Sequence, residues 1–325
     1  MQETYAQSEG LLFGMYVGSG VGIDLGLGAI AGPIDNTEKI TAALDELCGE
    51  RPFLIRGYQG YAGNSITLNS TPCKMEQFCS STRKLDLAIC YRPAVGDMED
   101  WKMYVKSVIN HYKDVLVKIQ LTEEPNNPDS VSGGDGSSPM VIEAIVAGVV
   151  SAKEEIHRLG IEVQVGFNAV ITFDSNDTFW PTLNQLIIPQ FKESLDYVGL
   201  DFYPGVFRPL PPHLPLEKAV EAVLRQFREH NLPIVGIGSE IPIHITENGW
   251  PTSATRSESE QAEAVEVIIR TIYALRRELN VTHYEFFDLR DADSSDSGFR
   301  FGLLRDDYSA KPAFDVFKRL VAALS

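Results

Sequence analysis

Two glutamates, Glu123 and Glu124, stand side by side in KIQLTEEPNN (118–127), where an apolar run ends. A third, Glu247, follows another apolar run in HITENGWPT (244–252). Cleavage of an acetal needs an acid that protonates the leaving oxygen and a carboxylate that captures the oxocarbenium-like centre. Glu124 and Glu247 have the chemistry for these two roles. Carboxyls about 5–5.5 Å apart would act by double displacement, with retention of configuration.

The ordinary alternative for both segments is a surface turn. A glutamate before proline is most often a solvated turn residue. Glu-Asn-Gly tripeptides are frequent in turns because Asn and Gly tolerate positive φ. The catalytic interpretation therefore depends on where the fold places the two glutamates.

Short apolar runs alternate with longer amphipathic runs along the chain. The apolar runs predict strands over 11–18, 52–58, 85–91, 115–121, 161–167, 196–203, 241–246 and 283–289. The amphipathic runs predict helices over 36–47, 98–112, 140–160, 216–230, 258–279 and 311–324. Asn36 and Thr37 predict the start of the first helix, and Gly160 predicts the end of the third. This alternation predicts an α/β fold, a single (β/α)8 TIM barrel over residues 1–325.

A doubly wound sheet is the competing architecture. It would carry a glycine-rich phosphate loop after the first strand, and VGSGVGIDLGLG (17–28) lacks GxGxxG at that place. We interpret this segment as a loop and favour the barrel, in which chemistry lies at the C-terminal ends of the strands. That rule selects as site candidates Arg56, Tyr58, Glu123, Glu124, Asn168, Tyr203, Glu247, Trp250 and the pair Asp291 and Asp293.

Composition narrows the ligands that such a barrel could bind. The formal net charge of −17 argues against a nucleic-acid partner and an anionic membrane, and favours a neutral substrate. No stretch approaches the roughly 18 apolar residues that span a bilayer. The segment MQETYAQSEG lacks the regions of a signal peptide, so we expect a cytoplasmic protein, or a secreted one if a signal was removed. Cys73 and Cys79 could bridge a short loop, but we favour reduced thiols.

The segments TEEPNN and ITENGWPT together resemble the acid/base and nucleophile segments of clan A glycoside hydrolases, the retaining (β/α)8 glycosidases. The resemblance implies that Glu124 is the acid/base and Glu247 the nucleophile. LIRGY resembles the segment whose arginine, here Arg56, braces the nucleophile. VGLDFYP resembles the segment that offers the nucleophile an aromatic hydroxyl, here that of Tyr203. With EFFDLRDAD and FGLLRDDYSAKPAF near the end, the resemblance spans about residues 11–318.

Two residues depart from the family pattern. The family usually has Asn before the acid/base, in contact with the sugar 2-hydroxyl and the nucleophile. This chain has Glu123 there, and an ionised carboxylate accepts hydrogen bonds but does not donate them. The eighth strand offers Phe286 where many members have Trp, which implies a smaller sugar platform. The other candidates for stacking on sugar faces are Trp250, foremost, and Trp180, Tyr58 and Phe207.

The mechanism needs Glu124 and Glu247 in opposite protonation states. Arg56 and Tyr203 should favour the ionised form of Glu247, whereas like charges on Glu247 and Glu123 should disfavour ionisation of Glu124. The segment DADSSDSG (291–298) misses the ligand order of an EF-hand, and we interpret it as a polar loop that holds substrate or is solvated. We expect no metal and no cofactor.

A retaining β-glycosidase acting on a neutral oligosaccharide or glycoside is the leading hypothesis. A transglycosylase would use the same glutamates, with a sugar in place of water. A non-catalytic carbohydrate-binding barrel is the alternative from another class, which Glu123 keeps open and the intact Glu124 and Glu247 oppose. An enzyme of phosphorylated metabolites would need a glycine-rich loop after strands seven and eight, where this chain has acids and Trp.

Overall fold

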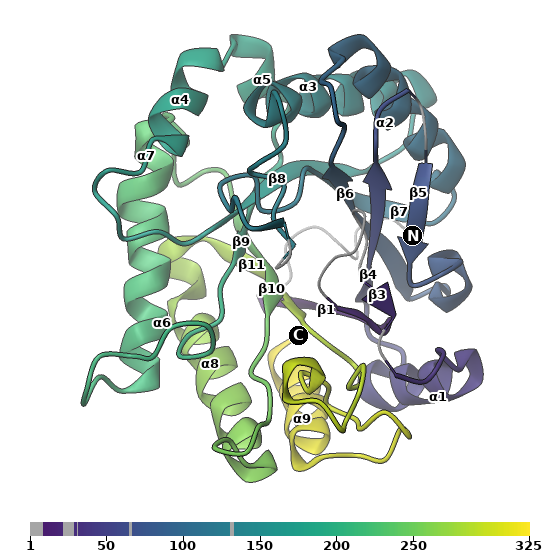
Figure 1. Ribbon diagram of the computed structural model, residues 1–325, viewed down its shortest axis with the longest axis vertical. Helices are drawn as coiled ribbons and strands as arrows, with labels where there is room; N and C mark the ends of the chain where they lie inside the picture. Colours follow the sequence, from purple (N-terminus) through teal and green to yellow (C-terminus); the bar gives the residue numbers. More distant parts are fainter. Residues whose placement is uncertain (1–8, 22–28, 31, 65–66, 131–132) are drawn as a thin grey trace.

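The computed structural model describes residues 9–21, 29–30, 32–64, 67–130 and 133–325. Its centre is a closed barrel of parallel strands with helices arranged around it (Figure 1). The barrel strands are β1 (Leu12–Tyr16), β4 (Phe53–Tyr61), β6 (Arg83–Tyr91), β7 (Leu116–Leu121), β8 (Gln164–Val170), β9 (Tyr197–Asp201), β10 (Ile243–Asn248) and β11 (Val281–Phe286). Each overlaps one predicted strand, so the (β/α)8 barrel is confirmed.

Strand β1 closes the barrel by pairing with both β4 and β11. Phe13 is in register with Phe53 on one side and with Tyr284 on the other, and both pairings are parallel. Beyond the barrel, β4 forms an antiparallel hairpin with β5 (Thr67–Thr71). Strands β2 (Gly20–Val21) and β3 (Ala29–Ile30) pair separately; of the glycine-rich segment 17–28, residues 22–28 lie outside the described residues.

The predicted helices are all present in the outer layer. They are α1 (Thr37–Cys48), α2 (Met98–Tyr112), α3 (Val141–Leu159), α6 (Leu216–Arg225), α8 (Glu258–Leu279) and α9 (Pro312–Leu324). The side chain of Asn36 caps α1 by accepting a hydrogen bond from the backbone N of Lys39 at 3.0 Å. Gly160 ends α3 in the left-handed region, with a φ of 65°. Both terminus predictions are confirmed.

Other parts of the outer layer differ from the prediction. The helix predicted over 216–230 ends earlier, because α6 passes into a π-helical segment (Gln226–Asn231) and then α7 (Leu232–Ile234). Pro233 lies in the first turn of α7, where its missing N–H leaves no hydrogen bond back to the preceding turn. The sequence pattern also missed α4 (Phe179–Leu186) and α5 (Pro189–Ser194), two short helices between β8 and β9.

The inside of the barrel carries charges, whereas apolar side chains fill the space between strands and helices. Arg56, Asp86, Lys118 and Glu285 lie inside the barrel, and each is at most 1% exposed. Asp86 Oδ2 accepts from Arg56 Nη1 at 2.9 Å and from Lys118 Nζ at 3.0 Å, and Lys118 also donates to Glu285. We name these four residues the interior ion network. Its two cations and two anions compensate one another, as buried charges require.

Two further expectations concern the chain as a whole. Within its described part, the chain has no helix with the length and apolar character needed to cross a membrane. The four cysteines, all of them described, are free, and Cys48 and Cys90 are buried.

Candidate active site

Four carboxyl groups meet at the C-terminal mouth of the barrel. Glu247 lies in β10 and Glu124 follows β7, at the ends of the seventh and fourth barrel strands. One carboxylate oxygen from each of Glu123, Glu124, Asp201 and Glu247 lies within 4.8 Å of the other three. We name these residues the carboxyl cluster. The spacing is close to the separation of about 5–5.5 Å that suits double displacement.

A β-bulge aims Glu247 into the mouth. The register of β10 against β9 shifts between Ile245 and Glu247, which interrupts the alternation of side chains between the two faces of the strand. Consecutive residues consequently both reach the cluster. The Thr246 hydroxyl donates to Asp201 Oδ1, and the Glu247 carboxylate accepts from two tyrosines.

The Glu247 carboxylate is held from both sides by hydroxyl donors. Tyr203 donates to Glu247 Oε2 at 2.7 Å, and Tyr58 donates to Oε1. Arg56 Nε lies 3.9 Å from Glu247 Oε1 and donates to the Tyr58 hydroxyl at 2.7 Å. Arg56 thus interacts with Glu247 directly, as an ion pair, and indirectly, through the Tyr58 hydroxyl. Both donors and the cation stabilise a carboxylate, which is the form a nucleophile needs.

Glu124 lies in a different environment. Burial raises the pKa of its carboxyl well above the usual range, and the charges of Glu247 and Glu123 raise it further. Its side chain accepts one hydrogen bond, from Asn127 Nδ2 to Oε2 at 2.6 Å. The backbone has a φ of 41°, which is uncommon for a residue other than glycine, and its N donates to Asn168 Oδ1 at 2.8 Å. The predicted direction of the pKa shift of Glu124 is therefore confirmed.

Glu123 is buried beside Glu124 and surrounded by donors. Its Oε2 accepts from Gln120 Nε2 at 2.6 Å and from Arg56 Nη2 at 3.3 Å, and its Oε1 accepts from Asn168 Nδ2 at 3.1 Å. Burial outweighs the charge of Arg56 and raises the pKa of Glu123 to about 8. Both of its oxygens have protein partners, so the carboxyl is part of the wall of the site.

Asp201 is a site residue that the sequence reasoning missed. It ends β9, is 1% exposed, and accepts from Thr246 Oγ1 and from Asn168 Nδ2. Burial raises its pKa well above the usual range, and the charges of Glu123 and Glu247 add to this effect. The available signal was an acid inside the apolar run DYVGLDFY, at the C-terminal end of a predicted strand.

The cluster contains the ligand types of a divalent cation, but most of its carboxyl oxygens already accept hydrogen bonds. Glu123 accepts from Arg56, Gln120 and Asn168, and Glu247 accepts from two tyrosines. A cation between these carboxyls would stand next to the Arg56 guanidinium, which repels it. The carboxyls and their hydrogen-bond partners therefore fit acid–base and nucleophilic chemistry better than metal binding.

Phe286 does not lie at the mouth, contrary to its prediction as a sugar platform. Its ring is 1% exposed and packs 5.4 Å from the ring of Phe317 on α9. The physical reason is strand alternation, which turns Phe286 toward the helices. Phe287, the next residue, stacks instead on Tyr16 with ring centroids 5.2 Å apart. Tyr16 in turn packs edge-on against Tyr58.

Asp291 is also occupied by partners outside the carboxyl cluster. It is 1% exposed, and its Oδ1 accepts from Lys311 Nζ at 2.6 Å and from Gly302 N at 2.9 Å. Its Oδ2 accepts from Ser294 Oγ at 2.9 Å. The structure thus gives Asp291 a structural role, tying the loop after β11 to the start of α9, in place of the predicted substrate contact.

The remaining aromatic candidates divide between core and surface. Trp180 is 1% exposed and packs in the outer layer, so it cannot stack on a sugar. Trp250 is partly buried, with the Arg256 guanidinium 5.4 Å from its ring. Phe207 is 69% exposed, and its ring packs edge-on against Tyr203 at 5.3 Å. Phe207 is thus one ring away from the carboxylate of Glu247.

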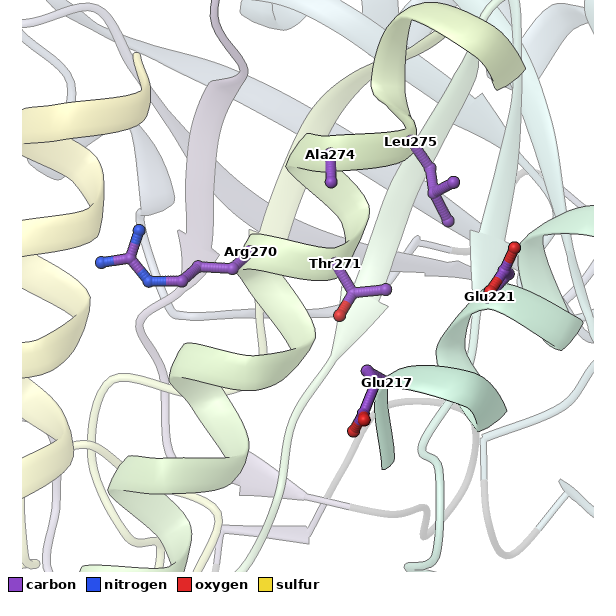
Figure 2. A pocket seen from close by; sticks show the side chains of 6 residues that line it. All are labelled: Glu217, Glu221, Arg270, Thr271, Ala274 and Leu275. Atoms are coloured by element: carbon purple, nitrogen blue, oxygen red, sulfur yellow. The ribbon is translucent and has the colours of Figure 1, made fainter. Parts of the chain in front are cut away.

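An open groove of about 300 Å³ lies on the outside of the barrel, between α6 and α8 (Figure 2). It is lined by Glu217, Glu221, Arg270, Thr271, Ala274 and Leu275. None of the cluster residues contributes to it. The groove is a packing feature of the helix layer, whereas the carboxyl cluster lies at the strand ends.

Comparisons with known proteins show a likeness in fold alone. No protein-family model matches the sequence, and no curated protein matches it. Solved structures match over nearly the whole chain at low identity. An apo β-glucosidase 1317 is 16% identical, with 89% of each chain covered and a TM-score of 0.60. The family 1 β-glucosidase from Thermotoga maritima is 13% identical, with 97% of this chain and 98% of that chain covered and a TM-score of 0.61.

A family 39 glycoside hydrolase from Bacteroides cellulosilyticus WH2 is 17% identical, with a TM-score of 0.62. That match covers 97% of this chain and 64% of the other. At such identities the likeness shows that the chain has the fold of these barrels. The argument about chemistry therefore depends on the residues at the mouth.

Proposed function

We propose that this protein is a retaining β-glycoside hydrolase, with Glu124 as the acid/base and Glu247 as the nucleophile. The observation that carries the proposal is the contrast between the environments of the Glu124 and Glu247 carboxyls. Glu247 accepts hydrogen bonds from Tyr58 and Tyr203, whereas burial and like charges favour the protonated form of Glu124. Two carboxyls in opposite environments within 4.8 Å are what double displacement requires. The fold shared with glycosidases supports the same conclusion.

The reaction proceeds in two steps. In the first, the Glu247 carboxylate attacks the anomeric carbon while Glu124 gives its proton to the leaving oxygen, and the sugar becomes covalently bound to Glu247. In the second, Glu124 removes a proton from water, which attacks the same carbon and releases Glu247. The hydroxyls of Tyr58 and Tyr203 keep the nucleophile oriented throughout. The acidic cluster and the net charge of −17 favour a neutral sugar.

Aryl β-glycosides with activated leaving groups test the roles of the two glutamates separately. Turnover by the wild type should fall by several orders of magnitude in Glu124→Ala and Glu247→Ala. Azide should restore both variants. It should give the inverted glycosyl azide with Glu247→Ala, because azide takes the face of the missing nucleophile. With Glu124→Ala it should give the retained azide, because azide attacks the glycosyl-enzyme. The same anomer from both variants would contradict the assignment.

The alternatives predict other results. A transglycosylase would give longer products when a free sugar acceptor is added, at the expense of hydrolysis. A carbohydrate-binding barrel would bind oligosaccharides in calorimetry without turning over any aryl glycoside. The intact and differently solvated Glu124 and Glu247 favour the catalytic function over this second candidate.

A further inference from the structure

Asp201 is a buried titratable residue at the mouth that the two-step reaction does not use. The Asn168 amide joins Asp201 to Glu123, another acid of the carboxyl cluster. Asn168 Nδ2 donates to Glu123 Oε1 at 3.1 Å and also to Asp201 Oδ2. The Asn168 carbonyl Oδ1 accepts from the backbone N of Glu124 at 2.8 Å. One amide thus connects two carboxyls to the backbone of the proposed acid/base.

The charges around this pair do not balance if both carboxyls are ionised. Arg56 contacts Glu123 and Glu247 and is shared with Asp86 below. Among the described residues, no other Lys or Arg forms an ion pair with a member of the carboxyl cluster. The further acids that face the pair are Glu247, Glu124 and Asp135, and Asp135 is already paired with Arg92. Two buried carboxylates in this position would repel each other, and a shared proton removes the repulsion.

The titration behaviour of the pair agrees with the geometry. Burial raises the pKa of Glu123 to about 8, and burial raises the pKa of Asp201 well above the usual range. The charge of Glu123 raises the pKa of Asp201 further. One oxygen of each carboxyl lies within 4.8 Å of the other, so ionisation of one opposes ionisation of its partner.

We propose that Glu123 and Asp201 hold one proton between them and act together as a single negative charge opposite Arg56. In this arrangement Asp201 is a positioning residue. It helps to place the backbone of Glu124 through the Asn168 amide, and the negative charge that it shares with Glu123 affects the protonation of the Glu124 carboxyl. The pair also accounts for a glutamate where an amide is usual. A carboxyl that shares a proton can both donate and accept hydrogen bonds, as an amide does.

The number of bound protons can be measured without any substrate, so this test is independent of the proposed hydrolysis. Urea unfolding of the wild type, Glu123→Gln, Asp201→Asn and the double variant is followed between about pH 5 and pH 7.5. In this window the folded pair keeps a proton that unfolded carboxyls have lost, so stability falls as pH rises. The slope of log K for unfolding against pH should be smaller by about one proton in each single variant.

The double variant separates one shared proton from two. Its slope should equal that of the single variants, because the pair holds only one proton. A slope smaller by two protons would mean that both carboxyls are protonated, and unchanged slopes would mean that both are ionised. Either result overturns the proposal. If the double variant does not fold, the slopes of the single variants still decide between ionised and protonated carboxyls. Infrared difference spectra between the wild type and each single variant then count the carboxylic-acid bands that each substitution removes.

The alkaline limb of kcat/KM gives a second readout in an active enzyme. Each single variant keeps the single negative charge of the pair, so the limb should stay within about 0.3 pH units of the wild type. The double variant loses that charge, and the uncompensated Arg56 should shift the limb to lower pH by about one unit. Equal shifts in the single variants would contradict the shared proton. Absence of turnover in all four proteins would refute the proposed function and leave the unfolding result unaffected.

Discussion

Replacing Tyr203 with phenylalanine removes the hydroxyl that donates to Glu247 Oε2 at 2.7 Å and leaves the ring in place. A hydrogen bond to an ionised group contributes about 1.5–3 kcal/mol. At about 1.4 kcal/mol per tenfold, this corresponds to a loss of roughly 10- to 150-fold. In the proposed reaction the Glu247 carboxylate takes part in the bond-forming step, so kcat and kcat/KM should fall together, with little change in KM.

Tyr58→Phe should have the larger effect of the two substitutions. The Tyr58 hydroxyl donates to Glu247 Oε1 and also accepts from Arg56 Nε at 2.7 Å. Its removal takes a donor from the carboxylate and leaves a buried guanidinium N–H without this partner, which adds a desolvation cost. We therefore expect Tyr58→Phe to lose several-fold more kcat/KM than Tyr203→Phe, on the same aryl glycoside.

Tyr61→Phe is the matched control. Tyr61 lies on the same strand as Tyr58, and its hydroxyl donates to Asp100 Oδ2 at 2.7 Å, away from the carboxyl cluster. Its substitution should lower the free energy of unfolding by about 1 kcal/mol and leave kcat/KM unchanged. If Tyr58→Phe and Tyr203→Phe fold normally and match Tyr61→Phe in kcat/KM, Glu247 is not the nucleophile.

Three further predictions test other parts of the reasoning. Burial and neighbouring charges raise the pKa of Glu124, so activity should fall as pH rises through that pKa and give an alkaline limb in the pH–rate profile. The variant Glu124→Gln, assayed with a dinitrophenyl glycoside, should lack this limb. Lys311→Met leaves the Asp291 carboxyl buried without its cation, so urea unfolding should show a loss of about 3–5 kcal/mol; an unchanged stability would contradict the structural role of Asp291. Phe207→Ala should change the free energy of unfolding by less than about 0.5 kcal/mol, because the ring is 69% exposed. The same variant should keep the wild-type kcat/KM on an aryl monoglycoside, whereas its kcat/KM on oligosaccharides should fall several-fold. Equal losses on both substrates would exclude Phe207 as a sugar platform beyond Tyr203.

The barrel could be predicted from sequence because its strands are buried on both faces and therefore read as continuous apolar runs. Long amphipathic helices were equally clear, and their ends carried recognisable caps such as Asn36 and Gly160. The short helices α4 and α5 were missed for a physical reason. They have 8 and 6 residues, which is too few for a helical period to emerge from the pattern.

The strand-end rule placed Glu124, Glu247 and their tyrosine partners at the mouth, but it could not say which way each side chain points. Alternation from the inward-facing His283 and Glu285 would have assigned Phe287, and not Phe286, to the interior. The bulge in β10 reverses that alternation locally and has no sequence signature. The partner of Asp291 was hidden for another reason, since Lys311 lies 20 residues away and only the folded loop brings it near.

The interior ion network has a consequence for how this sequence can change over evolutionary time. Removing one member leaves a buried charge without its partner, whereas apolar replacement of an entire buried network is often neutral or stabilising. Substitutions at Arg56, Asp86, Lys118 and Glu285 should therefore show strong epistasis, each harmful alone and tolerated in combination. Arg56 adds a constraint because it also contacts Glu123 and Glu247. Lineages that keep the proposed chemistry are then expected to inherit these four charges as one unit.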